Sequence, residues 1–187
     1  LLYTKLNIFL KPKIDKKFCK NADIWVILIP SQSVCKQYAK ILSDISHYTC
    51  IGLDYLPTAI KYVDFWLSCQ VGVFERCLRA GYLLNSHRVI LPEENVSELK
   101  TPWFKNNANS DRQFVVEPYY VFKTTYDKPV IQENGKLFGD ETGIIQAINF
   151  SLLNGAQSVI LLGDADFDES TKHKIRMFEQ YINIQHN

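Results

Sequence analysis

Residues 140–168 constrain the fold of this chain more than any other part of the sequence. A helix predicted there would be capped at Thr142, or at Asp140, and would close at Gly155, which reaches a left-handed conformation without a Cβ clash. Its buried stripe at helical spacing would comprise Ile144, Ile145, Ile148, Leu152 and Leu153. The apolar run 159–162 follows and predicts a strand that is buried on both faces, as in a parallel sheet.

The rest of the chain alternates strand patterns with helix patterns. Apolar and β-rich runs predict further strands over residues 23–30, 47–53, 64–69, 88–91 and 114–123, whereas residues 92–112 and 126–139 carry turn residues. Helix patterns cover residues 31–43, 73–84 and 172–184, and the last would bury Ile175, Phe178, Tyr181 and Ile182. Such alternation implies βαβ crossovers. We therefore expect the α/β fold class, with a mainly parallel sheet. Residues 1–187 would form a single Rossmann-like three-layer domain, to which residues beyond either end of the sequence can also belong.

Composition and charge exclude several classes of protein. The 21 Lys and Arg residues nearly balance the 20 Asp and Glu residues, so a net charge of +1 gives no electrostatic case for binding nucleic acid. No apolar run approaches the ~20 residues of a transmembrane helix. The 5 cysteines are scattered without metal-ligand spacing, which suits a cytoplasmic protein. Residues 1–20 are apolar and basic; an edge strand or leading helix is the favoured interpretation, and a peripheral contact with the inner face of a membrane is the alternative.

Three acids follow the predicted strand 159–162 at once. Asp164 and Asp166 stand at i and i+2, a spacing at which two carboxylates can bind one divalent cation such as Mg²⁺ or Mn²⁺. An apolar strand that ends in Asp-x-Asp resembles the metal-binding motif of the GT-A glycosyltransferases. The alternative is one acid that caps a helix, such as Asp168, beside one that is merely solvated.

Two further sites lie at the ends of earlier strands. Ser31 and Ser33 follow the strand 23–30, where backbone N–H groups at a helix start can bind a phosphate; the alternative is that the hydroxyls only cap the helix. Asp54 ends the strand 47–53, where an acid often binds a ribose hydroxyl in nucleotide-binding folds. A turn-capping Asp before Pro57 is an equal alternative.

Residues 142–168 also resemble a segment of known protein families. The segment TGIIQAINFSLLNGAQSVILLGDADFD resembles one shared by bacterial lipooligosaccharide sialyltransferases, flagellin-modifying motility accessory factors and archaeal-type hydroxymethylpterin pyrophosphokinases. The positions that match are Thr142, Gly143, Gly155, Val159, Leu161, Gly163, Asp166 and Phe167, with His173 in place of a later His.

This resemblance implies a glycosyltransferase-like enzyme that moves a sugar from a nucleotide-activated donor to a glycan acceptor in bacterial surface glycan assembly, namely of lipopolysaccharide, capsule or flagellin. Thr142, Gly143 and the helix start would meet a phosphate or a sugar carboxylate, with Gly163 in the opposite loop. Asp166 and His173 would be catalytic, with His173 as general base on the acceptor hydroxyl. The alternative interpretation of His173 is a solvent-facing residue between Lys172 and Lys174.

Two other functions remain open. One is a metal-dependent pyrophosphokinase of the same structural neighbourhood. The other is a non-catalytic binding module, which the loop Ile29-Pro30-Ser31-Gln32 favours because the resembling families carry a glycine there.

Overall fold

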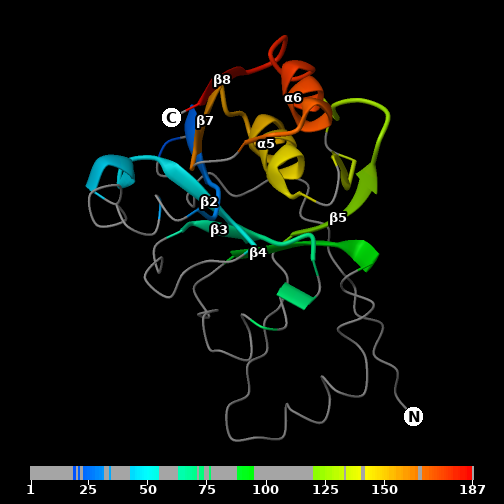
Figure 1. Cartoon of the computed structure of the whole chain (residues 1–187), viewed down its shortest axis with the longest axis horizontal. Helices are drawn as coiled ribbons and strands as arrows, with labels where there is room; N and C mark the ends of the chain where they lie inside the picture. The colour runs from blue at the N-terminus through cyan, green and yellow to red at the C-terminus, as the bar shows by residue number, and fades with distance from the viewer. Residues whose placement is uncertain are drawn as a thin grey trace, which may run out of the picture.

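The computed structural model describes residues 19, 21, 23–31, 34, 43–54, 63–70, 72–73, 76, 88–94, 120–132, 134–139, 142–163 and 166–186. Within them the chain forms an α/β fold around one 8-stranded sheet whose paired strands all run parallel, so the expected fold class is confirmed (Figure 1). The predictions for residues 1–18, 55–62, 95–112 and 114–119 lie outside the described residues. Among the described helices, none combines the length and the apolar character that crossing a membrane requires.

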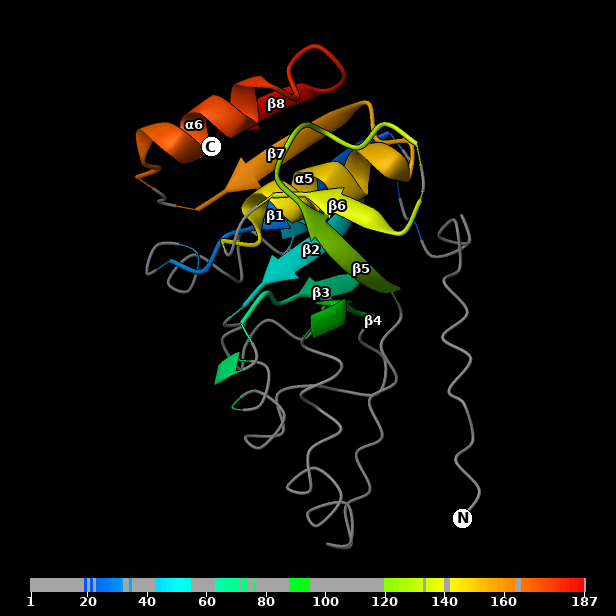
Figure 2. The same ribbon diagram turned by 90° about the vertical axis from the view of Figure 1, so that its right-hand side faces the viewer.

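The strands are β1 (Ile24–Leu28), β2 (Thr49–Leu53), β3 (Phe65–Leu67), β4 (Arg88–Pro92), β5 (Tyr120–Thr125), β6 (Lys136–Phe138), β7 (Ser158–Leu162) and β8 (Asn183–His186). Two helices, α5 (Ile144–Leu153) and α6 (Glu169–Arg176), are described in full. The order across the sheet is β6-β5-β4-β3-β2-β1-β7-β8, and Figure 2 shows the run from β7 through β1 and β2 to β3. The chain therefore builds outward from β1 to β6, returns through α5, and places β7 on the other side of β1. The strand order reverses at this point, which is where open α/β sheets bind their ligands.

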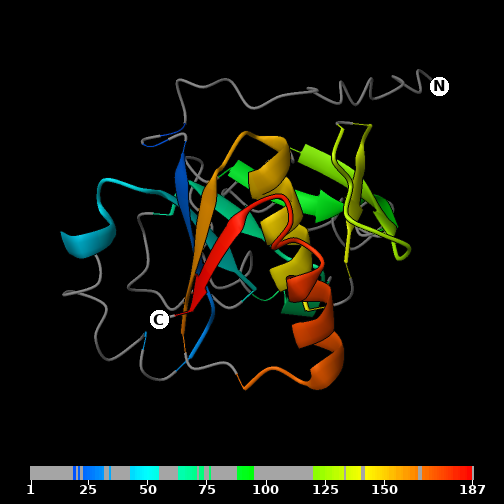
Figure 3. The same ribbon diagram turned by 90° about the horizontal axis from the view of Figure 1, so that it is seen from above.

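Each face of the sheet carries its own apolar core, because alternate residues of a strand point to opposite faces. On β1, Trp25 and Ile27 belong to the core that includes α5 and α6, while Val26 and Leu28 belong to the core on the other face. Figures 1 and 3 show α5 and α6 on the same side of the sheet. The runs that predicted β1, β2, β3 and β4 are therefore mostly apolar because both faces of these strands are covered.

Helix α5 is buried on nearly all sides rather than along one stripe. Every residue from position 144 to position 151 is buried. Leu152 and Leu153, the last positions of the expected stripe, are only half-buried but still pack against the core. The Phe150 ring lies 5.7 Å from that of Phe65 and 5.2 Å from that of Tyr120, so the helix packs against the two strands β3 and β5. A helix covered by strands, loop and α6 cannot present a solvated face.

Asn149 is a buried polar residue of α5 whose side chain makes three hydrogen bonds to backbone groups. Its Oδ1 accepts hydrogen bonds from the N–H groups of Val130, at 3.1 Å, and Phe138, at 2.8 Å. Its Nδ2 donates to the Val130 carbonyl oxygen at 2.8 Å. One buried amide thus satisfies three backbone groups of the β5–β6 loop and β6, which would cost free energy if left unpaired.

Two expectations for secondary structure are wrong. The helix predicted over residues 172–184 ends at Arg176, and the chain then turns and adds β8 beside β7, where Ser158 pairs with Asn183. Ile175, Phe178 and Ile182 are buried as predicted, but Tyr181 is 44% exposed. The second miss is β6, which lies in a segment expected to hold only turns and is a strand because it pairs with β5. Both are edge strands, whose conformation depends on a neighbouring strand more than on their own residues.

Candidate functional site

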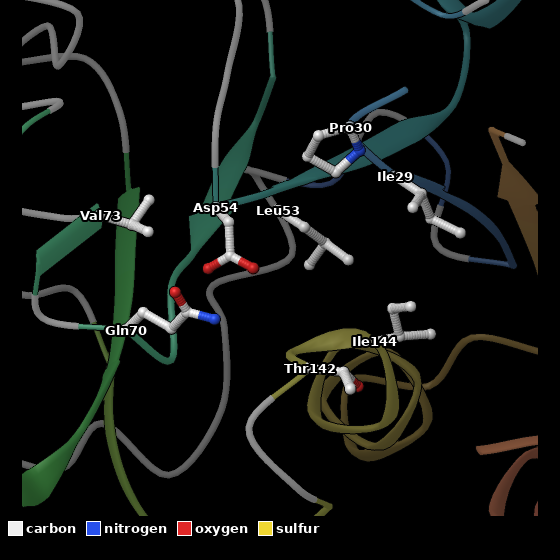
Figure 4. Close-up of a pocket in the computed structure, with 8 residues that line it drawn as sticks. All are labelled: Ile29, Pro30, Leu53, Asp54, Gln70, Val73, Thr142 and Ile144. Carbon is white, nitrogen blue, oxygen red and sulfur yellow. The ribbon is translucent and has the colours of Figure 1, made fainter. Parts of the chain in front are cut away.

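A pocket opens at the carboxyl ends of β1 and β2, beside the start of α5 (Figure 4). Its volume is about 350 Å³. It is lined by Ile29, Pro30, Leu53, Asp54, Gln70, Val73, Thr142 and Ile144. We call it the edge pocket. It lies next to the reversal of strand order, and it brings two of the sequence-predicted site residues, Asp54 and Thr142, to one place.

Asp54 enters the edge pocket in a conformation that β3 enforces. Its φ is 38°, the one positive φ among the described residues other than glycine. Its N–H donates to the Leu67 carbonyl oxygen at 3.0 Å, and its own carbonyl oxygen accepts from Trp66 Nε1 at 3.0 Å. Ser68 Oγ donates to the carboxylate Oδ1 at 3.1 Å. Positive φ is uncommon in residues other than glycine, although Asp adopts it more readily than most, and these contacts with β3 hold Asp54 in this conformation.

The environment of Asp54 also changes its acidity. Burial raises the pKa of the carboxyl to about 6, while the hydrogen bonds from Ser68 and from the Cys69 backbone N–H oppose part of that rise. The group is therefore ionised at pH 7 and neutral at pH 5. As an ion, it is an acceptor for the hydroxyl or amide donors of a ligand.

Helix α5 starts at the edge pocket without a side-chain cap. Its N-cap is Gly143, with φ of 75° and no side-chain hydrogen bond, so the prediction that Thr142 caps the helix is wrong. Asp140, the other predicted cap, lies outside the described residues. A Cβ at Gly143 would lie 3.2 Å from Leu67 Cδ2, so the glycine lets the helix start rest against the ends of β2 and β3. Within the described residues the first turn of α5 carries no acid, and the positive end of a helix dipole favours an anion.

Ser31 and Gly163 both have structural partners near the edge pocket. Ser31 Oγ accepts from the Val34 N–H at 3.2 Å, which is the helix-capping contact that the sequence left as one alternative. Ser33 lies outside the described residues. Gly163 has φ of 143°, and a Cβ there would lie 2.6 Å from the Ile29 carbonyl oxygen, so only glycine allows the ends of β7 and β1 to meet. A contact of either residue with a ligand stays a prediction.

The acids after β7 divide between two positions. Asp168 caps α6, since its Oδ1 accepts from the Thr171 N–H at 2.6 Å. Asp166 is exposed and does not line the edge pocket, and Asp164 lies outside the described residues. The described residues contain no group of three or more His, Cys, Asp or Glu side chains placed to hold a metal ion. A metal site at Asp164 and Asp166 therefore stays a prediction.

His173 lies on the surface of α6. It is exposed, and it is not among the residues that line the edge pocket. Its neighbour Lys172 forms an ion pair with Glu169 at 2.9 Å. The position agrees with a solvent-facing residue, and a role for His173 requires an acceptor that approaches from outside the pocket.

Sequence reasoning missed Gln70, the other polar side chain beside Asp54. It follows β3 as Asp54 follows β2, so the rule that identified Asp54 applies to Gln70 as well. Comparison of the chain with models of known protein families finds no match, and comparison with curated proteins finds none either. The geometry of the edge pocket and the resemblance of residues 142–168 are therefore what bears on function.

Proposed function

We propose that this chain is a glycosyltransferase-like enzyme that binds a nucleotide-activated sugar at the edge pocket and transfers the sugar to a glycan acceptor of the bacterial surface. One observation carries the proposal: Asp54 and the uncapped start of α5 line the same pocket at the carboxyl edge of a parallel sheet. A nucleotide-activated sugar presents both a polyol and an anion, and the pocket offers a partner for each.

The polyol is the ribose. Ionised Asp54 accepts hydrogen bonds from its hydroxyls, and the contacts from β3 hold the carboxylate in place before the ligand arrives. The anion is the phosphate. It lies at the start of α5, beyond Thr142, where backbone N–H groups and the helix dipole favour negative charge.

The sugar would be transferred near the end of β7. Adjacent strands lie roughly 4.8 Å apart, and β7 is two places from β2, so the chain past β7 begins about 10 Å from Asp54. A nucleotide-activated sugar is long enough to span that distance. Its sugar then reaches Asp166 and His173. His173 removes the proton of the acceptor hydroxyl as the glycosidic bond forms, while the bond between the sugar and the nucleotide phosphate breaks and the nucleotide leaves.

The proposal includes a divalent cation. Asp164 and Asp166 would hold Mg²⁺ or Mn²⁺, which neutralises a diphosphate leaving group. The acceptor is part of a surface glycan, so the chain acts in the cytoplasm at the inner face of the membrane.

Isothermal titration with cytidine and uridine 5′-diphosphates, with and without Mn²⁺, tests the proposal. We expect binding in the micromolar range or tighter, weakened at least about tenfold in Asp54→Asn because a charge-assisted hydrogen bond is worth roughly 1.5–3 kcal/mol. Asp127, an exposed acid in the β5–β6 loop, supplies the control variant Asp127→Asn. Asp166→Ala should lower donor affinity or turnover in a protein that remains folded.

The outcomes separate the three functions. Binding without metal favours the sialyltransferase-like branch, and binding that requires Mn²⁺ favours Asp164 and Asp166 as metal ligands. Transfer of a diphosphate from a nucleoside triphosphate would identify the pyrophosphokinase instead. If the folded chain binds no nucleotide, it is a non-catalytic module and the proposal is wrong.

A further inference from the structure

The edge pocket has two neighbouring polar side chains, Asp54 and Gln70, and its other lining residues are apolar except for Thr142. The Asp54 carboxylate and the Gln70 amide face the same part of the pocket in Figure 4, across from Ile29 and Pro30. Five of the lining residues are apolar, namely Ile29, Pro30, Leu53, Val73 and Ile144. The eight residues that line the pocket include no Lys, Arg or His. The pocket thus combines five apolar residues with a carboxylate, an amide and the Thr142 hydroxyl.

This charge distribution disfavours a phosphate in the interior of the pocket. Two like charges 4 Å apart repel by about 4 kcal/mol at the effective dielectric constant near a protein surface. A phosphate therefore lies away from Asp54, and a neutral group with hydrogen-bond donors lies beside it. The volume of the pocket also limits how much of the ligand it can hold. At about 350 Å³ the pocket is at the lower end of the roughly 300–1,000 Å³ typical of ligand sites, so it holds one part of a nucleotide-activated sugar.

We propose that the edge pocket is the nucleoside part of the donor site and that the Gln70 side-chain amide selects the base. This rests on the proposed function, because it assigns one half of the ligand named there. The apolar walls cover the faces of the base, Asp54 holds the ribose, and Gln70 meets the edge of the base that carries its donors and acceptors.

The anchoring of Gln70 suits a residue that selects a base. Its carbonyl oxygen accepts from the Val73 N–H at 3.1 Å and lies 3.2 Å from Ser68 Oγ, whose single hydrogen it shares with Asp54, so its backbone is held. Its side chain is exposed, and the amide offers both donors and an acceptor. A base that fails to match would leave polar groups unpaired on burial, which is how a site built on hydrogen bonds rejects a wrong ligand.

The test measures dissociation constants of the full chain for uridine, cytidine, adenosine and guanosine and for their 5′-diphosphates. We expect one base to bind at least about tenfold more tightly than the weakest, both as nucleoside and as diphosphate. Gln70→Ala should reduce that preference to about twofold or less, because a single hydrogen bond accounts for a factor of about two to ten. The affinity ratio between a diphosphate and its nucleoside should stay unchanged. Gln132→Ala, in the exposed β5–β6 loop, is the matched control and should keep the preference.

Two results would overturn the inference while the proposed function stands: diphosphates that bind without any base preference, or a preference that survives in Gln70→Ala. A loss of phosphate contribution in Gln70→Ala, with base preference intact, would place the phosphate rather than the base in the pocket. If the wild-type chain binds neither nucleosides nor diphosphates, the inference and the proposed function fail together.

Discussion

Replacing Asp54 with Asn should stabilise the folded chain at high pH. The Asp54 pKa rises from 3.8 to about 6 on folding because burial penalises the charged carboxylate. The folded chain therefore binds more protons than the unfolded chain between pH 4 and pH 6, and the free energy of unfolding falls as pH rises through that window. Above pH 6 the full penalty applies. Asn keeps the shape and the hydrogen-bond acceptor but carries no charge, so the variant escapes the penalty.

The magnitude follows from linkage. A shift of about two pKa units at 1.36 kcal/mol each sets an upper limit of about 3 kcal/mol. The Asp54 side chain is partly exposed, so solvent screens part of this, and we expect Asp54→Asn to gain about 1–2 kcal/mol at pH 8. Below pH 4 the carboxyl is protonated in both states, and the gain should vanish.

Urea denaturation of the wild type, Asp54→Asn and Asp127→Asn at pH 4 and pH 8 measures this difference. The stability of Asp54→Asn relative to the wild type should rise between the two pH values, and that of Asp127→Asn should not. Equal stability changes in Asp54→Asn at both pH values would show that the carboxyl is not desolvated, and the argument for its placement would fail. The same protonation should also affect binding: the affinity of the wild-type chain for a nucleotide should fall below pH 6, because Asp54 loses its charge.

Three further substitutions test how the strand ends and helices are held. Gly163→Ala should destabilise the fold by about 3 kcal/mol, because its Cβ would lie 2.6 Å from a backbone carbonyl oxygen at φ of 143°; Gly155→Ala, with positive φ but open space, should cost about 1 kcal/mol. Equal melting temperatures for the two variants would contradict the close contact. Asn149→Ala should cost about 3 kcal/mol in urea denaturation, because it leaves three backbone groups without their partner; a loss under 1 kcal/mol would mean that other groups replace it. Asp168→Ala should lower the free energy of unfolding by about 1 kcal/mol, because it removes the cap of α6, and should leave nucleotide affinity unchanged. A fall in nucleotide affinity would show that Asp168 contributes to binding.

Much of the fold could be predicted because its signals are local. The apolar runs at β1, β2, β3, β4 and β7 predicted strands, and their alternation with helices implies a parallel sheet. The expected burial of residues 159–162 on both faces is wrong, because Ile160 and Leu162 are half-exposed. Asp54 was predicted as a site residue because it follows a strand at the carboxyl edge. The two missed strands have a common cause. Strands β6 and β8 are edge strands, and their residues adopt extended conformation because β5 and β7 supply hydrogen-bond partners.

The amino-acid sequence by itself determined the strands β1, β2, β3, β4 and β7 and the polar residues that follow them, since side-chain period and turn chemistry act over a few positions. Tertiary structure alone decided that Asp54, Gln70 and Thr142 share one pocket. Those residues are separated by long stretches of chain, and they meet because α5 returns the chain across the sheet and Gly143 lets the helix start touch the ends of β2 and β3. It also decided the acidity of Asp54, because a pKa responds to burial and neighbours that exist only once β3 has paired with β2.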